Sequence, residues 1–400
     1  HASVSPLIKL LKKGHHGVEL TDKEWQTLYN WIDFNAPYHG KFKANVFKGV
    51  EQISRRTELT EKYAGSGVDW KAEIRSYADY LSKQEKPAAV KPERKEYKDK
   101  EVKLKGWPFD AATAKAMLSK ETETQKSIEL APGIRMNFVR VPAGSFVMGS
   151  NRGHSDYSPV SKQVVKKAFW MGEIEVSNEQ FRTIFPEHNS RFIGQLWKDH
   201  VHEGYPANNP EQPAIRVSWQ EAMDFCKKLS EKTGLNVTLP TEVQWEWACR
   251  AGSDDDFWYG SLNTDFAKFE NLADVQLNKA AVRGVNPQPM NPNDSWYKYY
   301  TYQPKENGVD DGNMLMVKGG SYQANPWGLY DMQGNVAEWT RSDYMPYPYN
   351  EKAQDGTGTE KVARGGSWTE HPKTCTSYYR KAYLPWQKVY NVGFRVIIED

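Results

Sequence analysis

Residues 325–339 read Asn-Pro-Trp-Gly-Leu-Tyr-Asp-Met-Gln-Gly-Asn-Val-Ala-Glu-Trp, and the fold is decided by this stretch and the segments around it. Its pattern of residue types is that of the whole chain from about residue 127 onward. Short aliphatic and aromatic segments alternate there with loops rich in Gly, Pro and Asn. That alternation predicts short strands joined by turns, not a helical bundle or a parallel sheet.

Working outward from this stretch, alternating apolar residues predict strands at residues 136–142 and 144–150. Capping boxes that begin at Ser177, Ser218 and Thr241 predict the starts of three helices. Residues 253–324 show little regular pattern. Loops of that length in a compact domain are usually functional, or held by something other than a core, and bound calcium is one such device.

The N-terminal part predicts a small helical region. A capping box from Thr21 to Glu24 precedes apolar residues at helical spacing, and residues 35–37 are expected to end that helix. Weaker helical patterns lie near residues 8–13 and 45–82. Mixed charges and two prolines over 83–106 indicate a solvated linker, and a helix-forming run follows it. We therefore expect three parts: a helical region at 1–82, a charged linker and helix at 83–126, and a domain at 127–400.

Composition excludes several classes of protein. The 400 residues include 53 Lys and Arg and 51 Asp and Glu, a net charge of +2, which gives no support for a nucleic-acid-binding face. Mean hydropathy is −0.78, and no apolar run reaches the length of a membrane span. Aromatic residues make up 13% of the chain within a hydrophobic total of only 38%, which predicts an aromatic core.

The number of cysteines and a search for common catalytic motifs limit which kinds of reaction the sequence indicates. Three cysteines allow at most one disulfide, and we expect Cys226 and Cys249 to be reduced and buried on amphipathic helices. The sequence lacks the nucleophile elbow, the P-loop, the dinucleotide-binding glycines, His-Glu-x-x-His and Cys-x-x-Cys. The chain begins at His1 with no secretory signal, so we expect it to be a portion of a longer polypeptide.

Four segments together carry a family resemblance. They are Pro142–Gly149 (PAGSFVMG), the pair PAIRVSW at 213–219 and LPTEVQWEWACR at 239–250, the opening stretch at 325–339, and Arg-Gly-Gly-Ser-Trp at 364–368 with Gly-Phe-Arg at 393–395. In this order they resemble the formylglycine-generating enzyme family, also called sulfatase-modifying factors, over residues 127–400. The resemblance implies an irregular α+β variant of the C-type lectin fold, low in regular secondary structure.

The family fold also implies bound calcium, a cation that prefers oxygen ligands. One family site uses the Gly-Asn-x-x-Glu-Trp turn, which corresponds here to Gly334, Asn335, Val336 and Glu338. The alternative interpretation of Glu338 is a buried acid paired with an arginine. A second family site corresponds to Asn271, Leu272, Asp311 and Asn313.

Active members of this family oxidise a client cysteine to formylglycine, using oxygen and a copper ion held by two thiolates. Soft sulfur ligands suit Cu(I). The resemblance puts the first thiolate at Glu370 and the second at Cys375, with Ser367 and Trp339 also in family positions. One of the two ligand thiols is therefore replaced by a carboxylate.

Two functions follow from this departure. The first is an extracytoplasmic bacterial binding or assembly module without the family's copper chemistry, whose partner is a protein or peptide client or a glycan. The second is a metal-dependent oxidase that modifies a client protein through Cys375, with Glu370 completing the site. A buried thiol favours the module, and an exposed thiol in a groove near Ser367 and Trp339 favours the enzyme. In the N-terminal 40 residues, the segments Leu10–His16 (LLKKGHH) and Trp31–Gly40 (WIDFNAPYHG) resemble the tail of large multidomain extracytoplasmic proteins related to hydrazine synthase alpha subunits.

Overall fold

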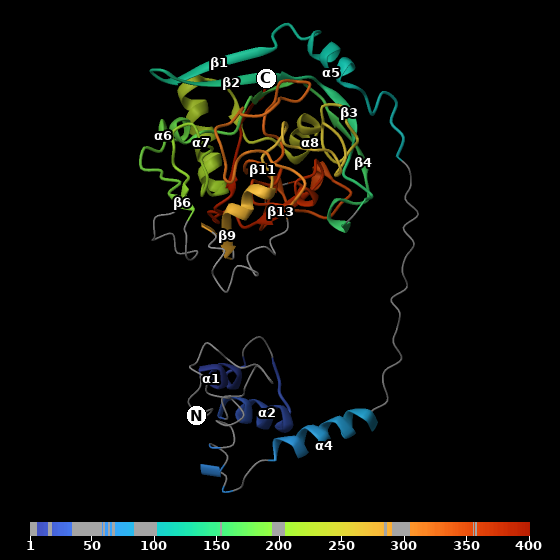
Figure 1. The fold of residues 1–400 in the computed structure, drawn as a ribbon, viewed down its shortest axis with the longest axis vertical. Helices are drawn as coiled ribbons and strands as arrows, with labels where there is room; N and C mark the ends of the chain where they lie inside the picture. Colours follow the sequence, from blue (N-terminus) through green and yellow to red (C-terminus); the bar gives the residue numbers. More distant parts are fainter. Residues whose placement is uncertain are drawn as a thin grey trace. The chain divides into compact units, whose positions relative to one another are not determined.

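The structure is a computed structural model that describes residues 6–14, 18–33, 58, 61–62, 65, 69–83, 102–152, 154–193, 205–283, 286–289, 305–354, 356 and 358–400. The chain divides into two compact units, residues 1–96 and residues 97–400. Figure 1 draws both units, coloured from the N-terminus to the C-terminus.

The first unit contains three described helices. They are α1 (Pro6–Lys12), α2 (Asp22–Asp33) and α4 (Trp70–Lys83). The capping box predicted before α2 is present, since the Thr21 amide donates to Glu24 Oε2 at 2.8 Å and the Glu24 amide donates to Thr21 Oγ1 at 3.4 Å. The predicted helix end at residues 35–37 lies outside the described residues, as does most of 45–69.

The larger unit is built on two curled sheets. The first has five strands in the order β1 (Gln125–Ala131), β2 (Ile134–Val141), β5 (Phe169–Gly172), β15 (Ile397–Ile398) and β8 (Val237–Thr238), and all of its pairs are antiparallel. The second has the order β13 (Arg380–Tyr383), β12 (Lys361–Arg364), β11 (Ala337–Asp343) and β14 (Val392–Gly393), with β14 parallel to β11. Both sheets therefore join segments that are far apart in sequence.

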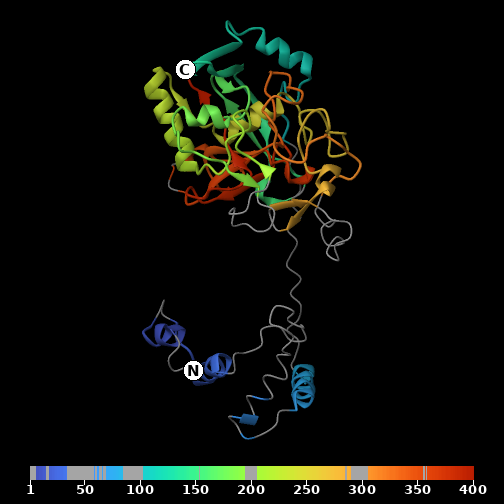
Figure 2. The same cartoon turned by 60° about the vertical axis from the view of Figure 1, so that its left-hand side comes forward.

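Smaller strand pairs and four α-helices complete the described part of this unit. The pairs are β3 (Gly144–Met148) with β4 (Ser161–Val165), β6 (Phe192–Ile193) with β7 (Tyr205–Pro206), and β9 (Ala280–Arg283) with β10 (Asn286–Pro289). The helices are α5 (Ala111–Leu118), α6 (Asn178–Arg182), α7 (Trp219–Thr233) and α8 (Glu242–Arg250). Figure 1 shows α6 and α7 on one flank and β3 and β4 on the other. In Figure 2 the irregular segment after α8, drawn in gold, runs along the side away from α7.

The local predictions for this unit are confirmed. Ser177, Ser218 and Thr241 are the N-caps of α6, α7 and α8, each with a complete capping box. Strands occupy most of 136–142 and 144–150. The fold is the irregular mixture of short strands and helices that the sequence predicts.

The core is aromatic, as the composition predicts. Trp245, Trp247, Trp327, Trp339 and Trp368 are all fully buried. Residues before the first strand add to this core, because the rings of Trp107 and Phe109 pack against Trp247. All three cysteines are free and buried. Among the described residues, no helix combines the length and apolar character needed to cross a bilayer.

Candidate functional site

The candidate site begins where β12 ends, at two glycines that turn the chain sharply. Arg364 anchors the end of β12 through buried ion pairs with Glu246 and Glu242 of α8. Gly365 and Gly366 follow with φ of 91° and 72°, a left-handed conformation that favours glycine. A Cβ added to Gly366 would lie 2.3 Å from Cys375 Sγ. The turn therefore brings residues 367–370 against the loop that carries Cys375.

Glu370 sits at the centre of a polar cluster. Its Oε1 forms an ion pair with Lys381 of β13 and accepts a hydrogen bond from Asn391 Nδ2 at 3.2 Å. Asn391 Nδ2 also donates to Ser367 Oγ at 2.8 Å. The second oxygen, Oε2, is buried and has no hydrogen-bond partner. The carboxylate at the predicted copper position is thus fixed by a lysine and an asparagine.

The electrostatics of this cluster stabilise the ion pair. Burial alone would lower the pKa of Lys381, but the charge of Glu370 and its hydrogen bond outweigh burial and raise the pKa above its ordinary value. The side chains of Glu370 and Lys381 are only 16% and 19% exposed. A pair that is shielded from water to this extent is costly to separate, because either partner alone would be a buried, unbalanced charge.

Cys375 is sealed from solvent, with an exposed fraction of 0%. It belongs to an apolar cluster with Phe257, Phe266, Leu272 and Val309. Its Sγ lies 3.7 Å from the carbonyl oxygen of Glu370, which accepts the S–H. Burial, with the nearby negative charge of Glu370, raises the pKa of the Cys375 thiol well above its ordinary value. The sulfur is therefore a protonated thiol at neutral pH.

Trp339 and Ser367 are equally buried, at 0% exposed. The Trp339 indole Nε1 donates to the carbonyl of Val217 at 2.9 Å, and its ring meets Tyr383 edge-on. The backbone amide of Glu370 donates to the carbonyl of Ser367 at 2.9 Å. The structure thus brings together Cys375, Glu370 and Ser367. Trp339 contacts Tyr383, which lies two residues after Lys381 on β13.

The predicted calcium residues Asn271, Leu272, Asp311 and Asn313 form one group. The backbone amides of Leu272 and Asn313 donate to the two oxygens of Asp311 at 3.3 and 2.7 Å. Asn271 Oδ1 is buried without a hydrogen-bond partner. Burial, together with the charges of Asp274 and Asp310, raises the pKa of Asp311 to about 7. An unpartnered amide oxygen beside a destabilised carboxylate fits a hard cation.

The other predicted calcium group, at Gly334, Asn335, Val336 and Glu338, is occupied by protein contacts. Glu338 is fully buried, and its oxygens accept from Arg395 Nε, at 2.8 Å to each, and from Trp245 Nε1 at 2.7 Å. The Asn335 amide side chain is bonded to Glu175 and to the Val317 backbone. These contacts match the alternative interpretation of Glu338 as an acid paired with arginine, and the calcium assignment at this group stays a prediction.

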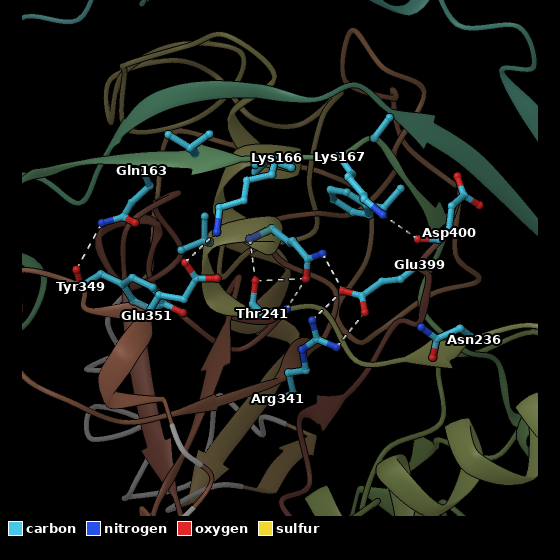
Figure 3. A pocket seen from close by; sticks show the side chains of 16 residues that line it. Gln163, Lys166, Lys167, Asn236, Thr241, Arg341, Tyr349, Glu351, Glu399 and Asp400 are labelled. Atoms are coloured by element: carbon cyan, nitrogen blue, oxygen red, sulfur yellow. Dashed lines mark hydrogen bonds and ion pairs between the residues drawn. The ribbon is translucent and has the colours of Figure 1, made fainter.

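Two further observations bear on where a ligand could bind. Among the described residues, no group of three or more Asp, Glu, His or Cys side chains is arranged to hold a metal. A cavity of about 340 Å³ is lined by residues of β4, the start of α8 and the end of the chain, and its side chains are drawn in Figure 3. Its charged side chains pair with one another, as Arg341 does with Glu399 at 2.6 Å and Lys166 with Glu351 at 3.7 Å. We therefore do not place the site there.

Comparison with known proteins identifies the family. A family model described as "Sulfatase-modifying factor enzyme 1-like domain" matches residues 124–400, more than half of the chain. The chain belongs to this sulfatase-modifying factor family. The match includes the Gly-Gly turn, the Glu370 cluster and both predicted calcium groups.

Individual members of the sulfatase-modifying factor family are distant from this chain. The formylglycine-generating enzyme of Mus musculus is 25% identical over 307 residues, covering 64% of this chain and 73% of the relative. The inactive C-alpha-formylglycine-generating enzyme 2 of Bos taurus is 26% identical over 284 residues, covering 61% and 80%. The solved structure of PvdO from Pseudomonas aeruginosa has a TM-score of 0.53 at 22% identity, covering 70% of this chain and all of that one. The structural likeness shows the fold alone.

Sequence reasoning missed several residues of the cluster. Lys381 and Asn391 hold Glu370, and no motif in the sequence points to either of them. Lys381 and Tyr383 lie on one face of β13 because side chains alternate along a strand, and that spacing is the one available signal. Arg395 stands out in the sequence only as part of the closing Gly-Phe-Arg motif, although it binds Glu338.

Proposed function

We propose that this chain is a non-classical sulfatase-modifying factor that acts outside the cytoplasm as a binding or assembly module for a protein or peptide partner. The observation that carries the proposal is the pair of positions 370 and 375. The first holds a carboxylate ion-paired with Lys381, and the second holds a thiol that is 0% exposed. Copper held by two thiolates needs two accessible sulfurs, and the site offers one sealed sulfur.

The oxidase alternative would require Cys375 to act as a nucleophile or a ligand. The thiolate is the reactive form of cysteine, and burial keeps Cys375 protonated. The Bos taurus relative whose name describes it as inactive supports a role for family members other than catalysis. Binding therefore accounts better for the geometry of this cluster than oxidation does.

A peptide or protein partner is favoured over a glycan. Sugars stack on exposed aromatic faces, and most of the aromatic side chains in the described part of residues 97–400 are in the core. Trp386, which is 69% exposed, is an exception, and it lies in the loop that follows β13. One exposed ring suits a peptide anchor better than a sugar-binding platform.

Alkylation of the native protein tests the proposal. With iodoacetamide at pH 8 and peptide mapping by mass spectrometry, we expect Cys375 to remain unlabelled until guanidinium unfolds the chain. Cys226 and Cys249 are matched internal controls, because both are also buried. Rapid labelling of Cys375 alone in the native state would contradict the proposal and support the oxidase.

We also propose that one calcium ion binds at Asn271, Leu272, Asp311 and Asn313 and ties residues 271–272 to residues 311–313. Calcium that binds only the folded state should stabilise it by about 2.7 kcal/mol at 100 times its Kd. We expect calcium to raise the Tm of the wild type and of the control Glu129→Gln, an exposed acid on β1. The Tm of Asp311→Ala should not respond to calcium. An equal response in all three proteins would overturn this assignment.

A further inference from the structure

A separate cavity of about 570 Å³ lies between the end of α6 and the start of α7. Two arginines, Arg191 and Arg216, line it together with Lys388, the acidic residues Glu187 and Glu221, and an apolar wall that includes Ile184 and Phe185. It shares no lining residue with the Glu370 cluster. The cavity combines positive charge with apolar surface, which is the character of a site for an amphipathic anion.

Both arginines have an unusual backbone conformation. Arg191 has φ of 60° and Arg216 has φ of 55°, and these are two of five non-glycine residues with positive φ in the described part of the chain. Such a conformation is unfavourable for a residue with a side chain and persists where surrounding contacts impose it. The Arg191 amide is held by Asn189 Oδ1 at 2.7 Å, and the Arg216 amide by the Val389 carbonyl at 3.1 Å. The fold thus positions both side chains at one cavity in spite of backbone strain.

The guanidinium of Arg216 is fixed in orientation. Its Nη1 donates to the carbonyl of Ser190 at 2.6 Å and its Nη2 donates to that of Phe192 at 3.2 Å. Burial, followed by the positive charge of Arg191, lowers the pKa of Arg216 to about 10. Arg216 therefore stays charged at neutral pH although a second cation is near. A carboxylate between the two guanidinium groups would offset that repulsion.

The remaining titratable groups of the cavity contribute little charge. Lys388 Nζ and Glu221 Oε1 form an ion pair at 2.6 Å, so their charges cancel. His188 packs edge-on against Phe181 and, mainly because of burial, its pKa is lowered to about 4, so it is neutral at pH 7. Glu187, an exposed acid, is the other charged residue among the described residues that line the cavity. The described residues that line the cavity therefore carry a net positive charge.

We propose that this cavity binds a peptide segment of the partner protein, with an Asp or Glu side chain between Arg191 and Arg216 and a neighbouring aromatic or aliphatic side chain against Ile184 and Phe185. The inference rests on the proposed function of the chain as a binding module, and it names the kind of segment that is bound.

Peptide selection tests this inference. A random peptide library displayed on phage is selected on the immobilised full chain, and the enriched peptide is synthesised and titrated by calorimetry. We expect enriched sequences with an acidic residue beside an aromatic or aliphatic one. Arg191→Gln should raise the Kd about tenfold or more, since a charge-assisted hydrogen bond to the acidic side chain is lost. Arg216→Lys should also weaken binding, because lysine cannot keep both of the hydrogen bonds to the Ser190 and Phe192 carbonyls that orient the charge.

The matched control is Lys162→Gln, which removes an exposed cation of β4 outside the cavity and should leave the Kd unchanged. If enriched peptides bind Arg191→Gln and Arg216→Lys as tightly as the wild type, the cavity assignment is wrong while the binding module stands. If selection enriches no peptide at all, the cavity assignment and the proposed binding function both fail. Enriched sequences without an acidic residue would also overturn the assignment.

Discussion

Replacing Arg395 with methionine should lower the free energy of unfolding of the family domain by about 3 to 5 kcal/mol, the cost of leaving a buried charge without its partner. Arg395 is 0% exposed. It donates to both oxygens of Glu338 and to the backbone carbonyls of Gly172 and Tyr330. Methionine fills similar volume but leaves Glu338 with Trp245 as its one remaining donor among these contacts.

Chemical denaturation followed by tryptophan fluorescence measures this loss. The matched control is Arg341→Met, which breaks the ion pair with Glu399 seen in Figure 3. The side chains of that pair are 30% and 29% exposed, so its loss should cost less than about 1 kcal/mol. The double variant Arg395→Met with Glu338→Gln should lose less than the sum of the single variants. If calcium restores the stability of Arg395→Met, Glu338 is a metal ligand after all.

Replacing Gly366 with alanine should destabilise the domain by about 3 kcal/mol or more, because two penalties combine. The residue has φ of 72°, and an added Cβ would approach Cys375 Sγ to 2.3 Å and its Cα to 2.9 Å. Because the Cα cannot rotate away as a side-chain tip can, the turn or the Cys375 loop must shift.

Gly234→Ala is the matched control for this substitution. Gly234 caps α7 with the same φ of 72°, and a Cβ added there would have no other atom within 4 Å. Its replacement should cost only the conformational penalty of about 1 kcal/mol. Both variants can be compared by the same denaturation experiment. Equal losses would show that the contact between Gly366 and Cys375 is not tight, and would weaken the conclusion that the thiol is sealed.

The helix starts were predictable from sequence because their causes are local. Ser177, Ser218 and Thr241 each sit three residues before the side chain that completes the capping box. By contrast, β14 and β15 are two residues long and exist because they pair with β11 and with β5 and β8. Strands of two residues are too short to show an alternation of apolar and polar side chains in the sequence.

The candidate site was only partly predictable for a similar reason. Motif position indicated Glu370 and Cys375, and both lie in one cluster. The partner of Glu370 depends on how β13 returns beside β12, which places Lys381 opposite Ala363. The partner of Glu338 lies 57 residues away at Arg395. A carboxylate in a motif cannot by itself indicate whether a cation or an arginine balances its charge.

The most direct measurement is a Cu(I) titration of the reduced full chain against a competing chelator, with wild type and Cys375→Ala compared. Because Cys375 is buried and Glu370 is held by Lys381, we predict the same weak copper retention in both proteins, with no Cys375-dependent site. One equivalent of Cu(I) held tightly by the wild type and lost in Cys375→Ala would contradict the account and restore the oxidase.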